Sequence, residues 1–442
     1  MWHYASSPVI PSWSDLREWS GASRFLPMLS RAFVAVQDAQ GSSCGIARPA
    51  HRGRTAGPAA TVAAMASTGF VVPPYPYDRL DGAKKLAAGL AGGLVDLSVG
   101  TPCDPPLPAV VEALARSGSE RGYPTSLGSP AYREAAAAWV ARRLGAEVDP
   151  ALQVAACIGT KEFVATTPQY LRLLRPDRDT VLYPAIAYPT YDMGAQFAGC
   201  RSVPVPVDEA FRIDLTAIDP EDAARALCLW VNTPGNPAGG LDDLGQAAAW
   251  GRSHDVAVFS DECYVEFTWD GPPRTILAHG TEGVVAVHSL SKRSNLAGLR
   301  VGFYAGDRDL VHFLSEVRKH AGFMVPGPVQ AAGAVAFGDD QHVDEQRGRY
   351  RARMERLAEA LRGLGLSVAL PGGSFYLWIR VPGGDAWAAT EWLARHGGAL
   401  VSPGEFYGVA GSEYIRVALV APDDRIDLVT QRLASAPAFT GC

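Results

Sequence analysis

Several features that would assign this chain to common protein classes are missing. No apolar run is long enough to cross a membrane. The formal net charge is −6, so no basic surplus indicates binding to nucleic acid or to anionic lipid. No G-x-G-x-x-G follows an early strand, which argues against a dehydrogenase that binds a dinucleotide. We therefore expect small-molecule partners, with no nucleic acid and no membrane.

Cysteine is present but follows no framework. The seven cysteines are odd in number and never spaced C-x-x-C, and Cys157 and Cys228 sit inside apolar stretches. This pattern favours buried thiols over a disulfide network or a zinc site. We predict no metal and a reducing, cytoplasmic location.

The bulk composition is that of a globular protein. Hydrophobic residues make up 48% and charged residues 19% of the 442 residues. A chain of this length can bury one large core and a second, smaller one.

Residues 1–64 differ from the rest of the chain. They are rich in Ser, Gly and Ala and show neither a helical nor a strand period. A secretory signal is not indicated, because no apolar segment follows a basic start. We interpret this stretch as a disordered or non-native extension, with translation starting at Met65; a transit-like or regulatory tail is the alternative. It carries six arginines: Arg17, Arg24, Arg31, Arg48, Arg52 and Arg54.

The remaining chain divides into three predicted parts. Residues 65–105 form an extended, proline-rich arm and part of a small domain, and residues 326–442 complete that small α+β domain. Residues 106–325 form a large domain, in which short β-rich runs alternate with helical patterns. Several runs, such as ALCLWVN and VVAVHSL, are continuously apolar, which is typical of parallel strands covered on both faces. Ligands of such sheets lie at the carboxyl ends of the strands.

The segment VHSLSKRSNLAGLR, residues 287–300, places a lysine among hydroxyls and an arginine. Lys292 can condense with an aldehyde, while Ser289, Ser291 and Arg300 can hold a phosphate. Taken alone, the turn is equally compatible with a solvated lysine. Asp261 in SDECY lies 31 residues upstream and Asn236 in NTPGNPAG a further 25.

These motifs, in this order, resemble the fold-type I aminotransferases that use pyridoxal 5′-phosphate (PLP). The similarity runs from about residue 68 to the C-terminus and is greatest to bacterial N-succinyldiaminopimelate aminotransferases. It implies an α/β PLP-transferase fold, with a mostly parallel sheet flanked by helices in the large domain and a smaller α+β domain. It also implies that Lys292 binds the cofactor covalently and acts as the general base.

The resemblance assigns roles to the other motif residues. Asp261 would bond the ring nitrogen, and Asn236 and Tyr264 would bond the phenolic oxygen and lower the pKa of the lysine–cofactor linkage. The phosphate would meet Ser289, Arg300 and the start of the helix at Gly159, Thr160 and Lys161, although a simple cap by Thr160 explains that motif equally well. Tyr188 would stack on the ring, unless it is a core residue. Tyr123 would reach the phosphate of the neighbouring subunit in a homodimer.

Substrate recognition is also implied by resemblance. Arg416 in SEYIRVAL would hold the α-carboxylate, with Arg380 as the competing candidate, and Asn236 and Gly100 would line the same site. Arg293, Lys161 and Ser374 are candidates for the distal part of the substrate. The implied reaction is succinyldiaminopimelate transamination coupled to glutamate and 2-oxoglutarate.

Three alternatives remain at this point. An aminotransferase of aspartate or aromatic type shares all the motifs, and a PLP β-lyase or acyltransferase shares the cofactor. A PLP-fold transcription regulator would need a basic helix-turn-helix upstream, which residues 1–64 do not show.

Overall fold

The computed structural model describes residues 70–441, of which residues 74–441 form one compact folded unit. The predictions for residues 1–64, including the start at Met65, lie outside the described part. No helix among the described residues is long and apolar enough to cross a membrane.

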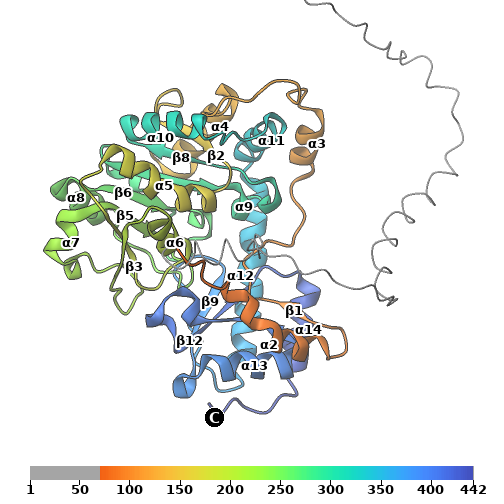
Figure 1. Cartoon of the computed structure of the whole chain (residues 1–442). Helices are drawn as coiled ribbons and strands as arrows, with labels where there is room; N and C mark the ends of the chain where they lie inside the picture. Colours follow the sequence, from red (N-terminus) through yellow and green to blue (C-terminus); the bar gives the residue numbers. More distant parts are fainter. Residues whose placement is uncertain (1–69, 442) are drawn as a thin grey trace, which may run out of the picture. The chain divides into compact units, whose positions relative to one another are not determined.

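A seven-stranded sheet forms the centre of the larger part of the molecule (Figure 1). Its strand order is β2-β8-β7-β6-β5-β3-β4, and only β8 runs antiparallel to its neighbours. The predicted α/β class with a mostly parallel sheet is confirmed. The strands are β2 (Val154–Cys157), β3 (Thr180–Pro184), β4 (Arg201–Val205), β5 (Ala226–Asn232), β6 (Ala257–Asp261), β7 (Val284–Ser289) and β8 (Gly302–Gly306).

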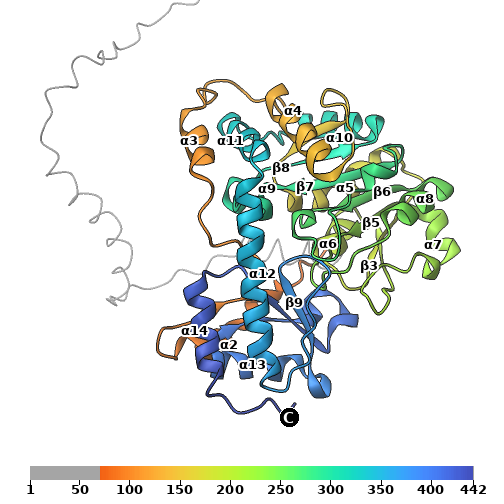
Figure 2. The ribbon, with the colours of Figure 1, turned by 180° about the vertical axis from the view of Figure 1, so that it is seen from behind.

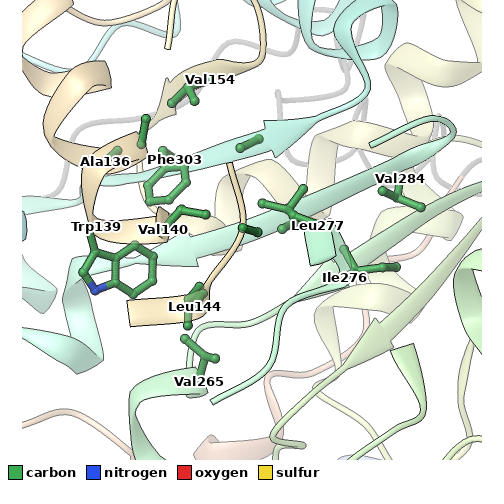
Figure 3. Packing of buried hydrophobic residues seen from close by; sticks show 14 of the residues in the cluster. Ala136, Trp139, Val140, Leu144, Val154, Val265, Ile276, Leu277, Val284 and Phe303 are labelled. Carbon is green, nitrogen blue, oxygen red and sulfur yellow. The ribbon is translucent and has the colours of Figure 1, made fainter. Parts of the chain in front are cut away.

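Helices cover both faces of this sheet, which explains why its central strands, such as β5, are largely apolar. On one face, Phe303 lies beside Trp139 and Val140, and Val284 lies at the other end of the same cluster beside Ile276 (Figure 3). On the other, alternate strand residues such as Val285 and Tyr304 belong to a second core. The large-part helices are α3 (Pro108–Arg116), α4 (Pro130–Trp139), α5 (Thr160–Leu174), α6 (Thr190–Phe197), α7 (Pro220–Arg225), α8 (Leu244–His254), α9 (Leu290–Arg293), α10 (Arg308–His320) and α11 (Gly327–Gly338).

A separate core lies around two small sheets near the C-terminus. One is antiparallel, with the order β11-β12-β9, and the other is the parallel pair β1 and β10. The strands are β1 (Val95–Asp96), β9 (Tyr376–Arg380), β10 (Ala399–Leu400), β11 (Ser402–Pro403) and β12 (Tyr414–Ala418). The helices are α2 (Asp81–Ala88), α12 (Gln341–Arg362), α13 (Ala386–Gly397) and α14 (Asp423–Leu433).

The long helix α12 joins the two cores (Figure 2). Its middle contributes Tyr350 to an aromatic cluster, and its later turns contribute Met354 and Leu357 to the small-sheet core. Helix α11 instead packs Ala332 and Phe337 into the core of the large sheet. The domain limits at 105/106 and 325/326 stay predictions.

One local expectation is wrong, and one strand was missed. Residues 76–80 of the predicted extended arm form a 3-10 helix, Pro76–Leu80, which proline at its first position favours. Strand β2 was not predicted, because its four small residues give no clear period.

Candidate active site

Polar residues gather where the parallel strands end, as the sheet topology requires. Asn232 ends β5 and is the register partner of Asp261, which ends β6. Asn232 also donates from Nδ2 to the backbone carbonyl of Asp261 at 2.8 Å and accepts from the Asn236 amide at 2.8 Å. The predicted residues Asn236 and Asp261 are therefore held at one edge of the sheet by Asn232, which the motifs alone do not single out.

Asp261 is a buried carboxylate that forms no ion pair among residues 70–441. Its oxygens accept from the Tyr191 hydroxyl at 2.9 Å and from the Cys263 amide at 3.2 Å. Burial raises its pKa, against the lowering effect of these hydrogen bonds and of Lys292. A carboxylate in this setting fits a ligand that offers an N–H cation.

Lys292 lies on α9 directly after β7, and its side chain is half-buried. Its amine donates to the carbonyl of Gly100. Burial is the main cause that lowers the pKa of Lys292 to about 8; Arg416 and Arg300 contribute to this lowering, and Cys263 and Asp261 oppose it. Part of the population is therefore unprotonated near neutral pH, which is the form that attacks an aldehyde.

The start of α5 forms a candidate phosphate site. Gly159 has φ +73°, and a Cβ at this position would overlap the guanidinium of Arg300. Glycine thus lets Arg300 approach the free amides of the first turn. Thr160 accepts from the Cys263 thiol at 3.2 Å, which ties this turn to the loop after β6. Ser289 caps α9 by accepting from the Ser291 amide at 3.1 Å.

Tyr188 follows β3 and is half-buried. Its ring lies 6.3 Å from that of Tyr191, at 85°, and Lys161 lies 5.9 Å above its centroid. Burial raises the pKa of Tyr188 to about 12, so it stays neutral. Tyr123 is fully exposed, and residues 70–441 of the single chain give it no partner within the site.

Arg416 is buried, at 2% exposure, yet no acidic side chain among residues 70–441 pairs with it. Its Nη1 donates to Asn236 Oδ1 at 2.8 Å, and its Nη2 donates to the Ser98 carbonyl and, at 3.3 Å, to the Tyr77 hydroxyl. Its Nε has no partner among these residues. A buried cation without a counter-ion is costly, so this arrangement fits a bound carboxylate.

Two aromatic rings flank the same guanidinium. Its carbon lies 4.1 Å from the centroid of Tyr376 and 4.6 Å from that of Tyr407. The Tyr376 hydroxyl bonds that of Tyr264 at 2.8 Å, so Tyr264 is linked to the Arg416 surroundings. The competing candidate, Arg380, is exposed and paired with Glu413 at 2.7 Å, which removes it from the site.

One candidate for the distal substrate is wrong. Arg293 is buried and paired with Glu266 and Asp340, each at 3.1 Å, because it points away from Lys292 into the core. Ser374 is buried, and its Oγ accepts from the Tyr376 amide at 3.4 Å, so its role as a substrate contact stays a prediction. Lys161 alone remains exposed.

Comparison with known proteins fits this geometry. Residues 93–433 match the family model described as aminotransferase class I and II. The chain belongs to the class I and II aminotransferases. This family uses pyridoxal phosphate, and the architecture of the chain is that of PLP fold type I.

The similar members of the family are named for different activities. The chain is 42% identical to the 4-dedimethylamino-4-oxo-anhydrotetracycline transaminase OxyQ of Streptomyces rimosus, over 82% of this chain and 99% of that protein. It is 33% identical to the LL-diaminopimelate aminotransferase of Aquifex aeolicus, over 82% of this chain and 96% of that protein. A solved probable N-succinyldiaminopimelate aminotransferase from Thermus thermophilus matches with TM-score 0.73 and 33% identity, over 81% of this chain and 98% of that one.

Proposed function

We propose that this aminotransferase binds PLP through Lys292 and exchanges the α-amino group of a substrate whose carboxylate is held by Arg416. The buried, unpaired guanidinium of Arg416 carries this proposal. Near the same site lie a half-buried amine and a buried carboxylate that also lack ionic partners among the described residues. Such a set is complementary to a ligand that brings one cationic ring nitrogen and several anionic groups.

The residues present fit the cofactor at each of its polar groups. Asp261 would hold a proton on the ring nitrogen, and Asn236 and Tyr264 would face the phenolic oxygen. The amides of α5, with Arg300 and Ser289, would hold the phosphate. When bound, PLP supplies a ring that withdraws electrons from the α-carbon of the substrate.

The chain's own residues account for proton transfer and orientation. The Lys292 amine, once released from the cofactor, is an adequate base near neutral pH, because burial lowers its pKa to about 8. Arg416 fixes the α-carboxylate with a planar donor pair and so restricts the rotation of the substrate. Gly100 allows the substrate to approach the backbone closely, since it has no side chain.

For the substrate, we propose an N-succinyl-2-amino-6-oxopimelate acceptor with glutamate as donor. The Thermus thermophilus neighbour supports this class. Lys161 supports it as well, since its amine lies 5.6 Å above Tyr75 and 5.9 Å above Tyr188 and forms no ion pair among the described residues. The Lys161 amine can therefore bind a carboxylate at the distal end of the substrate.

A second candidate is a flat, polycyclic ketone of the kind named for OxyQ. The 42% identity over 99% of that protein favours it. The neighbouring rings of Tyr75 and Tyr77, with centroids 5.5 Å apart and planes 33° apart, offer an aromatic surface next to Lys161. A planar substrate could pack on such rings.

The active site is also proposed to be shared between two subunits. Tyr123 is 100% exposed in the single chain, as expected for a side chain that belongs to a partner's phosphate site. Mixing Lys292→Ala and Tyr123→Phe variants would test this, because a mixed dimer regains one intact site. Activity that does not rise on mixing, in a protein that is dimeric by light scattering, would contradict a shared site.

A half-reaction screen tests the function. The purified, PLP-loaded protein is mixed with single amino donors, and the absorbance of the lysine-bound cofactor is followed. Conversion by glutamate and N-succinyl-LL-diaminopimelate, but not by aspartate or aromatic amino acids, supports the proposal. Conversion only by the amine of the tetracycline intermediate favours the second candidate, and pyruvate release from cystathionine would indicate a β-lyase.

A further inference from the structure

Tyr376 has no role in the assignments above, although it lies between the two halves of the site. It begins β9 of the small antiparallel sheet, pairs in register with Ala418, and is 1% exposed. Its neighbours are the cofactor-side Tyr264 and the substrate-side Arg416. One side chain therefore touches a residue from each half.

The bond between the two phenols restricts the direction of their hydrogens. The hydroxyl oxygens of Tyr264 and Tyr376 are 2.8 Å apart, and each phenol has one hydrogen to donate. If Tyr264 donates to Tyr376, it has no hydrogen left for a ligand. If Tyr376 donates to Tyr264, the hydrogen of Tyr264 is free for an acceptor in the site.

The position of the Tyr376 hydroxyl is fixed by its surroundings. A Cβ at Gly100 would overlap it, and the carbonyl of Gly100 accepts from the Lys292 amine. The ring lies against the guanidinium of Arg416, with 4.1 Å between the guanidinium carbon and the ring centroid. The same side chain thus supports the residue that holds the α-carboxylate.

We propose that Tyr376 is a positioning residue, whose hydroxyl donates to Tyr264 and so directs the Tyr264 hydrogen at the phenolic oxygen of the cofactor, while its ring supports Arg416. The inference rests on the proposed function. A donor that itself accepts a hydrogen bond is strengthened, so Tyr376 adds to the stabilisation of the phenolate that Tyr264 provides.

The spectroscopic pKa of the lysine-bound cofactor, read from its absorbance against pH, measures this effect. Tyr264→Phe should raise that pKa by roughly 1–2 units. Tyr376→Phe keeps the ring and should raise it by roughly 0.3–0.5 unit, with the KM for the amino donor unchanged. Tyr376→Leu removes the ring as well, and should also raise the KM several-fold.

The double variant Tyr264→Phe/Tyr376→Phe is decisive, since the Tyr376 hydroxyl can change this pKa only through Tyr264. It should show the shift of Tyr264→Phe alone, and additive shifts would overturn the inference. Tyr350→Phe is the matched control, because it removes a hydroxyl from another buried ring, 4.9 Å from Phe375, and should leave the pKa unchanged. A normal absorbance band with no shift in Tyr376→Phe overturns this inference alone; no band in the wild type overturns the proposed function and the inference together.

Discussion

Two buried arginines, Arg416 and Arg293, occupy opposite electrostatic settings. Arg293 is 3% exposed and its charge is neutralised by Glu266 and Asp340. Arg416 is 2% exposed and meets only an amide oxygen, a backbone carbonyl and a hydroxyl within the described chain. Because burial of an uncompensated charge is costly, the difference separates a structural cation from one that is arranged for a ligand.

Two adjacent residues, Lys292 and Arg293, differ in the same way. Lys292 and Arg293 share one short helix, but only Lys292 faces the site, where its amine meets the Gly100 carbonyl and no acid of the described chain. The Arg293 guanidinium lies 5.5 Å from the Trp139 ring in the core. Residue type and position alone therefore do not separate the two cations; the presence or absence of an ion pair does.

The largest effect is expected from Lys292→Ala. Transamination should fall about 10³-fold or more, because the base and the cofactor linkage are both lost. The absorbance of the lysine-bound cofactor should vanish, while the melting temperature stays within a few degrees. Lys319→Ala, at an exposed surface pair with Glu316, serves as control and should retain full turnover.

Exchanging the two arginines for methionine tests the comparison itself. Arg293→Met should lower the free energy of unfolding by about 3–5 kcal/mol, since Glu266 keeps a buried charge with one partner fewer. Arg416→Met should raise the KM for the amino donor about 100-fold and leave stability equal or higher. Denaturant unfolding and steady-state kinetics measure both. The opposite pattern would remove the distinction between a structural and a ligand-binding cation.

Gly100→Ala tests how tightly the residues around Arg416 are packed. The new Cβ would overlap the Tyr376 hydroxyl, so the ring and Arg416 must shift. A drop in kcat/KM of roughly 10- to 100-fold is expected, because small misplacements of catalytic groups are costly. Gly348→Ala on α12 has open space around its Cβ and should leave kcat/KM unchanged. Equal activity of the two variants would show that Gly100 is not constrained.

The smallest expected effect is the change with pH in the stability of the protein without PLP. Burial lowers the pKa of Lys292 from 10.5 to about 8, so the unfolded chain binds more protons than the folded one between these values. The free energy of unfolding should therefore rise with pH from about 8 to 10.5. Below pH 8 Lys292 is protonated in both the folded and the unfolded state, so the full cost of burying its charge is present. Lys292→Met should remove this rise and stabilise the apoprotein at about pH 7 by about 1–2 kcal/mol, less than the full shift implies because the side chain is half-buried. Identical pH profiles for both proteins would contradict the lowered pKa.

Much of the large sheet could be predicted from the sequence. Its central strands are largely apolar because helices cover both faces, and the motif residues lie at their ends because parallel strands end at one edge. Local spacing was therefore sufficient to group Asp261, Asn236 and Lys292. The roles given to these residues, the shared dimer site and the cytoplasmic location remain predictions.

The substrate side depends on contacts between distant segments, which local spacing does not encode. Tyr77 and Tyr376 meet Arg416 from 339 and 40 residues away in the chain. The prediction for Arg293 is wrong for the same reason, since its partners Glu266 and Asp340 lie 27 and 47 residues away. Tyr191, which donates to Asp261, could have been found from the sequence. It follows the predicted residue Tyr188 by three positions, and the two rings lie close together at the start of α6.

Reductive trapping tests the central claim most directly. The chain contains only five lysines, Lys84, Lys85, Lys161, Lys292 and Lys319, so peptide mapping is unambiguous. After the protein is loaded with PLP and treated with borohydride, mass spectrometry should find one phosphopyridoxyl group, on Lys292, and none in the Lys292→Ala variant. A label on Lys161 or on a surface lysine, with Lys292 unmodified, would contradict the account.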